Sequence, residues 1–141
     1  MSTPEARRWL DYARSDLDAG RALLRASEPY PRQVCFLAQQ AAEKAFKALL
    51  VLLDIEFPYT HDLDRLRESV PPGWRVKAEF PQLYALSIWA VESRYPGDMP
   101  EVMESDAQEA LQLAERVYRT IEQDIQASVG QNPTAAGQQN G

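Results

Sequence analysis

The sequence predicts an all-α protein, an antiparallel up-and-down bundle of four long helices and one short helix. Three observations support this prediction. Residues 34–53 contain no glycine or proline and are rich in Ala, Leu, Lys, Gln and Glu, which is strong helix composition. Apolar residues recur at helical spacing in the other long segments. The connections between these segments are short and marked by proline or glycine, which favours antiparallel neighbours.

The central helix is expected from about Arg32 to near Asp54. Its apolar side chains cover a broad face of a helical wheel, and the alanines on that face would let neighbouring helices pack closely. A narrow opposite stripe is polar, at the spacing i, i+3, i+4, i+7, and consists of Gln40, Glu43, Lys44 and Lys47. The stripe is either a structural polar face, in which Glu43 pairs with lysine, or a face on which the lysines meet phosphate.

Capping residues and chain breakers set the bounds of two further helices. The first helix is expected to have Thr3 as its N-cap and to end near Ser27. The short helix is expected to have Thr60 as its N-cap, to carry the only histidine, His61, in its first turn, and to reach about Val70. The helix dipole at that position disfavours a charged imidazolium.

Two more long helices complete the predicted bundle. One is expected over residues 77–93, and the last is expected to start at residue 102 or 105 and to end near residue 127. Residues 1–128 then form one domain, which is long enough to bury a core without disulfides or metals. Residues 129–141 have no apolar pattern and are expected to be disordered.

Composition excludes several classes of function. The net charge of −6 argues against strong nonspecific binding to nucleic acid, and we expect no DNA partner, because such binding depends on Lys and Arg. No apolar run is long enough for a membrane span. One cysteine and no signal-peptide core favour the cytoplasm. No metal-ligand cluster, phosphate loop or catalytic serine pattern is present in the sequence, so we expect no metal and no cofactor.

Four segments in a fixed order carry a family resemblance. They are ARSDL at residues 13–17, QQAAEKAFKALL at residues 39–50, THDL at residues 60–63 and SRYP at residues 93–96. Together they resemble the HEPN family, the "higher eukaryotes and prokaryotes nucleotide-binding" domain, over about residues 6–126. The resemblance implies an all-α bundle that is commonly a homodimer. It also implies frequent genomic pairing with a minimal nucleotidyltransferase.

Many HEPN proteins are metal-independent ribonucleases, often toxins, whose motif is an Arg followed by His within four to six positions. Residues 95–101, which follow Arg94, contain no histidine, so no catalytic residue is assigned. Such chemistry needs a proton-transfer group beside the scissile phosphate. His61 is expected at the opposite end of the bundle, roughly 24 Å away for a helix of about 16 residues.

The candidate ligand-binding residues gather around Arg94, because a guanidinium group suits phosphate. Arg32 is expected near the same end of the bundle and would join Arg94 around one phosphate. Lys44, Lys47 and Asp16 would shape the cleft. The alternatives are structural: Arg94 would hold its loop through carbonyl groups or Asp16, and Asp16 would pair with a neighbouring Lys or Arg.

The sequence therefore favours a binding or partner module. It would be a homodimer that binds a nucleotide or RNA phosphate weakly, or that docks on a minimal nucleotidyltransferase. Two alternatives stay open. One is a metal-independent RNase toxin with a degenerate Arg-x(4–6)-His motif, and the other is a purely structural partner subunit.

Overall fold

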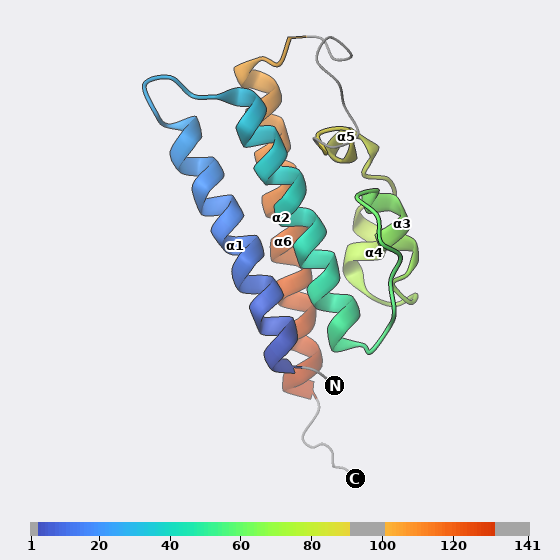
Figure 1. Ribbon diagram of the computed structural model, residues 1–141. Helices are drawn as coiled ribbons and strands as arrows, with labels where there is room; N and C mark the ends of the chain where they lie inside the picture. The colour runs from blue at the N-terminus through green and yellow to red at the C-terminus, as the bar shows by residue number, and fades with distance from the viewer. Residues whose placement is uncertain (1–2, 91–100, 132–141) are drawn as a thin grey trace.

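The computed structural model describes residues 3–90 and 101–131, and all regular structure in these ranges is helical. The predicted all-α class is therefore confirmed. Three helices are long: α1 (Thr3–Leu24), α2 (Pro31–Leu52) and α6 (Glu104–Gln131). Three are short: α3 (Leu63–Glu68), α4 (Arg75–Glu79) and α5 (Tyr84–Ser87). The long helices form a bundle, and the short ones form a layer along one side of it (Figure 1).

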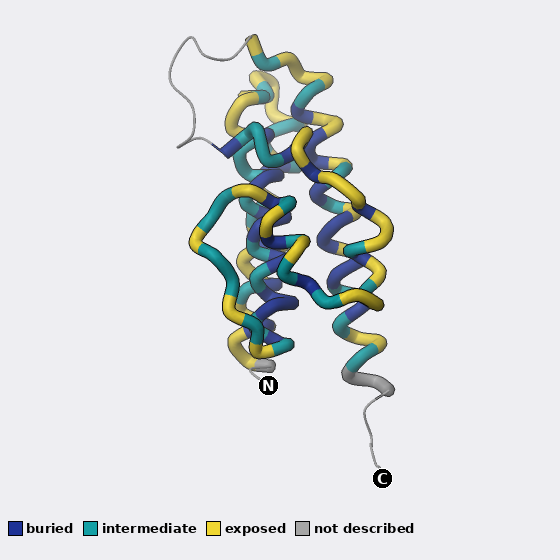
Figure 2. Tube along the Cα trace, turned by 90° about the vertical axis from the view of Figure 1, so that its right-hand side faces the viewer, coloured by how far each residue is buried: buried dark blue, intermediate teal, exposed yellow. Residues whose placement is uncertain are grey.

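Helix α2 is the central element of the fold. It packs against α1 and α6 and also contacts α3 and α5. Its alanines, among them Ala38, Ala41 and Ala45, are fully buried and allow close approach, while Phe46 and Leu49 fill the space between the helices. Figure 2 shows the buried residues along the inward faces of the helices and the exposed residues outside. The central role predicted for this segment follows from its small and apolar surface.

A long helix over residues 77–93 is not formed in the described part of the chain, because α4 and α5 are separate and short. Pro81 lies within the predicted helix, where proline removes a donor and its ring clashes with the preceding turn. Phe80, which precedes it, has φ −124° and ψ 78°, outside the helical region. The Asp64 carboxylate then accepts a hydrogen bond of 2.6 Å from the backbone N–H of Leu83, which fixes the break between α4 and α5.

The short helix α3 begins two residues later than expected. Its N-cap is Asp62, whose carboxylate accepts a hydrogen bond of 3.0 Å from the backbone N–H of Asp64. Thr60 is not the cap; its hydroxyl oxygen accepts from the backbone N–H of Asp62, ahead of the helix. His61 therefore lies outside the helix, on the segment that returns along α2 (Figure 1).

The bounds of the long helices follow the sequence closely. Helix α1 ends at Leu24, three residues before the expected end, and α2 begins one residue early, with Pro31 in its first turn. Helix α6 continues to Gln131, and residues 132–141 of the predicted tail lie outside the described residues. No helix in the described ranges combines the length and the apolar content that crossing a bilayer requires.

We expect Leu49→Ala to destabilise the protein by about 2–5 kcal/mol, because Leu49 is fully buried between the long helices and the truncation leaves a cavity. Leu53→Ala is the matched control, because Leu53 lies at the end of α2 and is only partly buried. Urea denaturation measures both free energies of unfolding. Equal losses for the two variants would contradict the central position of α2.

Candidate functional site on helix α2

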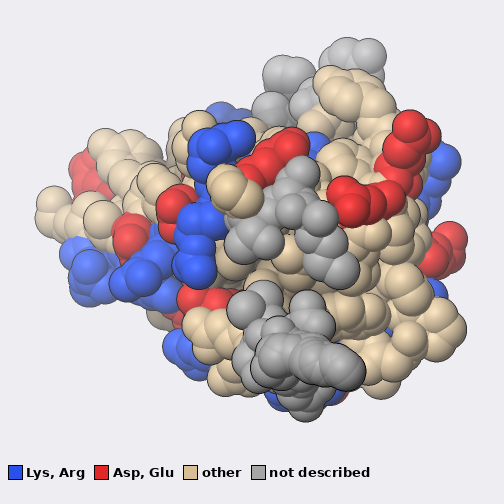
Figure 3. Space-filling model, turned by 90° about the horizontal axis from the view of Figure 1, so that it is seen from below, with Lys and Arg blue, Asp and Glu red and all other residues tan. Residues whose placement is uncertain are grey.

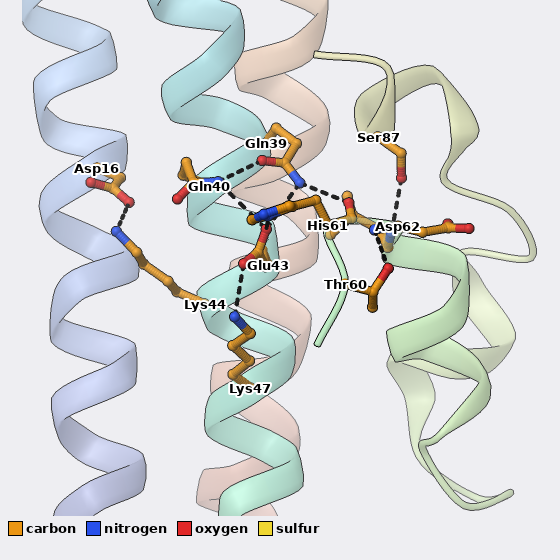
Figure 4. Close-up of polar contacts among 11 residues, drawn as sticks. Asp16, Gln39, Gln40, Glu43, Lys44, Lys47, Thr60, His61, Asp62 and Ser87 are labelled. Atoms are coloured by element: carbon orange, nitrogen blue, oxygen red, sulfur yellow. Dashed lines mark hydrogen bonds and ion pairs between the residues drawn. The ribbon is translucent and has the colours of Figure 1, made fainter. Parts of the chain in front are cut away.

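A buried carboxylate organises the polar stripe of α2. Glu43 is 3% exposed, and its oxygens accept hydrogen bonds of 2.8 Å from Lys47 Nζ and 2.8 Å from His61 Nδ1. Gln39 Nε2 donates a further bond of 3.2 Å to the same carboxylate. These side chains converge between α2 and the segment that leads to α3 (Figure 4). A buried charge of this kind is tolerated because it is both paired and hydrogen-bonded.

Helical spacing explains why the cluster forms. Gln39, Glu43 and Lys47 follow one another at intervals of four residues, so they share one face of α2. Gln39 Nε2 also donates to the backbone carbonyl of His61 at 3.0 Å, which ties the returning segment to the helix. Gln40 Nε2 in turn donates to Gln39 Oε1 at 2.8 Å. One face of α2 thus anchors the loop that carries the only histidine.

The charge state of Glu43 follows from these contacts. Burial alone would raise the pKa of Glu43, but the hydrogen bonds from Lys47 and His61 and the charge of Lys47 hold it below its usual value. The carboxylate is therefore ionised at neutral pH. An ionised carboxylate only accepts hydrogen bonds, so Nδ1 of His61 carries the proton of their shared contact.

Lys47 is enclosed by the fold. Its side chain is 13% exposed, and Nζ lies 5.4 Å from the ring centre of Trp9 and 5.8 Å from that of Phe57. These distances are in the range of cation–π attraction. Together with the Glu43 contact, they give the ammonium group partners on several sides. A phosphate would have to displace these partners to reach it.

The second predicted lysine is also paired. Lys44 Nζ lies 2.7 Å from Asp16 Oδ2, which joins α2 to α1. Asp16 therefore pairs with a neighbouring lysine, as the structural alternative for this residue predicts. Arg32 is exposed near the start of α2, and Arg94 lies outside the described residues. Of the candidate residues, the structure brings together Asp16 and Lys44 but keeps Lys47 in the separate Glu43 cluster.

The position of His61 differs from the prediction. It lies beside the middle of α2, next to Glu43, and not at the far end of that helix. The sequence contains a signal that points to such a contact: a glutamate on a helix that is otherwise apolar and alanine-rich needs a buried partner. The connection of ten residues between α2 and α3 is long enough to return along the helix and supply one.

A cavity of about 400 Å³ adjoins the returning segment, in the size range of small-ligand sites. Its described lining combines carboxylates, hydroxyl groups and apolar carbons. The lining residues are Thr60, His61, Asp62, Asp64, Tyr84, Ser87, Ile88 and Ala90. The described lining contains no Lys or Arg, so its chemistry suits hydrogen-bond donors better than phosphate. Sequence reasoning missed Ser87, whose hydroxyl oxygen accepts from the backbone N–H of Leu63 at 2.9 Å.

The family model described as "HEPN domain" matches residues 6–124. The match covers all six helices apart from the first residues of α1 and the last residues of α6. The chain belongs to the HEPN family. No curated protein sequence matches it significantly. Among the described residues of this HEPN bundle, no group of three or more His, Cys, Asp or Glu is placed to hold a metal ion.

Two solved structures share the HEPN fold of this chain. One is the crystal structure of TT1696 from Thermus thermophilus, with 26% identity and a TM-score of 0.71, over 84% of this chain and 97% of that one. The other is that of ST0689, described as an archaeal HEPN homologue, with 27% identity and a TM-score of 0.62, over 85% of this chain and 97% of the other. Almost the whole of each relative is therefore matched.

We expect the two carboxylates that pair with the lysines of the stripe, Glu43 and Asp16, to differ in their effect on stability. Glu43→Ala leaves Lys47 and His61 without their shared acceptor in a buried site, at a cost of about 3–5 kcal/mol. Asp16→Ala breaks a pair that is partly exposed, at a cost of at most about 1 kcal/mol. Urea denaturation of both variants is the measurement. Similar losses would show that Glu43 does not organise the cluster.

Stability should also depend on pH through Glu43. Because its folded pKa lies below the usual 4.5, its contribution is complete above pH 4.5 and is lost as pH falls through the folded value. The difference in unfolding free energy between wild type and Glu43→Gln should therefore shrink in acid. Denaturation at a series of pH values measures it. Glu28→Gln, at an exposed position, is the control and should show a constant difference.

Proposed function

We propose that this protein is a non-catalytic HEPN module, a cytoplasmic homodimer that binds a nucleotide or RNA phosphate and works with a minimal nucleotidyltransferase. The nucleotide or phosphate would be a ligand and not a substrate that the chain itself cleaves. Family membership supports the general class. The particular role is supported by the way the chain uses its only histidine.

The observation that carries the proposal is the contact between His61 and Glu43. The imidazole donates to a buried carboxylate, and the backbone carbonyl of His61 itself accepts from Gln39. Both contacts anchor the segment between α2 and α3, which is a structural task. The residues after Arg94, where ribonucleases of the family carry their histidine, contain none. This distribution favours binding over cleavage.

The two lysines of α2 already pair with carboxylates, so we look for the phosphate contacts at other residues. Lys44 and Lys47 are each balanced by a carboxylate, so we assign them and Asp16 to shaping the cleft. Arg32 is exposed near the start of α2 and makes no ion pair with a described residue. Helix α5 and the start of α6, which flank residues 91–100, lie toward that same end of the bundle (Figure 1). We therefore propose Arg32 and Arg94 as the phosphate contacts.

The rival function is a metal-independent ribonuclease that uses His61. One observation favours it: a carboxylate that accepts from Nδ1 fixes the imidazole tautomer, and catalytic histidines are oriented in this way. In a neutral imidazole the second nitrogen, Nε2, is then an acceptor. The two functions differ in whether RNA is consumed.

A ligand titration tests the proposal. We expect AMP, ATP or a short RNA at millimolar concentration to raise the melting temperature, because a ligand that binds only the folded state stabilises it. Arg32→Ala and Arg94→Ala should reduce the shift. Arg65→Ala, at an exposed position on α3, is the matched control and should leave the shift unchanged.

Incubation with total RNA in the absence of metal separates the two functions. Intact RNA is the expected result. Cleavage by the wild type that is lost in both Arg94→Ala and His61→Ala would contradict the binding module and support the ribonuclease. If none of the three ligands raises the melting temperature, the ligand-binding function is contradicted and a purely structural subunit is favoured. Co-purification with a minimal nucleotidyltransferase then tests for the partner.

A further inference from the structure

One flank of helix α1 carries four exposed charges of alternating sign, Arg7, Asp11, Arg14 and Asp18, which we call the α1 charge stripe. The intervals between them are four, three and four residues, so the side chains share one side of the helix. The pattern has a particular symmetry. Read in the reverse direction, the spacing is unchanged and every sign is inverted.

The stripe is largely unused within the protomer. Arg7, Asp11 and Arg14 make no hydrogen bond or ion pair with any described residue, although the i, i+4 spacing would allow such pairs. Asp18 pairs with Arg21 at 2.7 Å, but its side chain remains 62% exposed. Figure 3 shows basic and acidic side chains interleaved on one side of the molecule, viewed from the end of the bundle. These charges are available to an outside partner.

A groove of about 260 Å³ lies beside the stripe, between α1 and α6. Its lining includes Arg14 and Asp18 from the stripe, and Tyr118 and Arg119 from α6. Burial raises the pKa of Tyr118 most, and the charges of Asp11 and Arg14 both act on the same phenol. The groove therefore lies along the half of the stripe formed by Arg14 and Asp18.

We propose that the α1 charge stripe is the face through which two copies of this chain associate, with their α1 helices antiparallel across a two-fold axis. This inference rests on the homodimer of the proposed function and assigns its interface. The axis passes between residues 12 and 13. Arg7 then faces the partner's Asp18, and Asp11 faces the partner's Arg14. By symmetry each of these contacts occurs twice.

Charge complementarity favours this register over its neighbours, and it favours a second copy of the chain over other partners. A shift by one helical turn in either direction places like charges opposite each other, Arg7 on Arg14 or Asp11 on Asp18. A nucleic acid would meet two aspartates on the same stripe. A second copy meets an opposite charge at every position, and the stripe adds no net charge to a chain of −6. Because exposed ion pairs are individually weak and screened by salt, the association is expected to weaken as salt rises.

Charge reversal and mixing test the interface by sedimentation velocity at low and high salt. Asp11→Arg alone places two arginines together at each contact, and Arg14→Asp alone places two aspartates together. Each variant should dimerise at least about tenfold more weakly than wild type. An equimolar mixture of the two should associate like wild type, because each heterodimer contains only opposite charges at these positions.

Two reversals outside the stripe are the controls. Glu28→Arg and Arg65→Asp cause the same changes in net charge at exposed positions and should leave the dimer unchanged. Circular dichroism confirms that all variants keep their helices. Single variants that remain dimeric, or a mixture that associates no better than its components, would overturn the assignment of this face. A wild type that is monomeric at all concentrations would overturn the homodimer as well, while the ligand titration reports on the binding function independently.

Discussion

The Glu43 carboxylate is the constraint on which the polar part of this structure depends. Its position on a helix buried by neighbours on several sides removes it from water, which is costly for an ionised group. The cost is met by donors from the same helix and from the segment that precedes α3. The buried charge thus anchors the ten-residue connection that leads to α3 at His61.

The same constraint shapes what the protein can bind. A helix whose lysines satisfy internal carboxylates has little cationic capacity left for a phosphate on that face. Guanidinium groups that pair with no described residue lie elsewhere, near the start of α2 and along α1. The most recognisable block of the sequence is therefore mainly a structural element, because both of its lysines pair with carboxylates of the same chain.

The sequence predicted most of the fold, because the long helices follow from local composition and periodicity. The central role of α2, its polar stripe and the internal pairing of Glu43 with a lysine were all accessible from spacing within one helix. The prediction of one helix across Pro81 was wrong because it relied on apolar periodicity, although the proline in the sequence indicates a break. The contact between His61 and Glu43 was not predicted, because it depends on the tertiary path of a loop and not on spacing. The ligand-binding role of Arg94 stays a prediction.

The docking of the returning segment has a consequence for the order of assembly. Helices α2 and α6 are separated by residues 53–103, and closing so long a connection carries an entropy cost that grows with the logarithm of its length. The contact between Glu43 and His61 spans 18 residues, and that between Asp64 and Leu83 spans 19. Both contacts can form before α6 packs against α2. The side layer thereby folds much of the connection against its neighbours and shortens the free chain that the last helix must close.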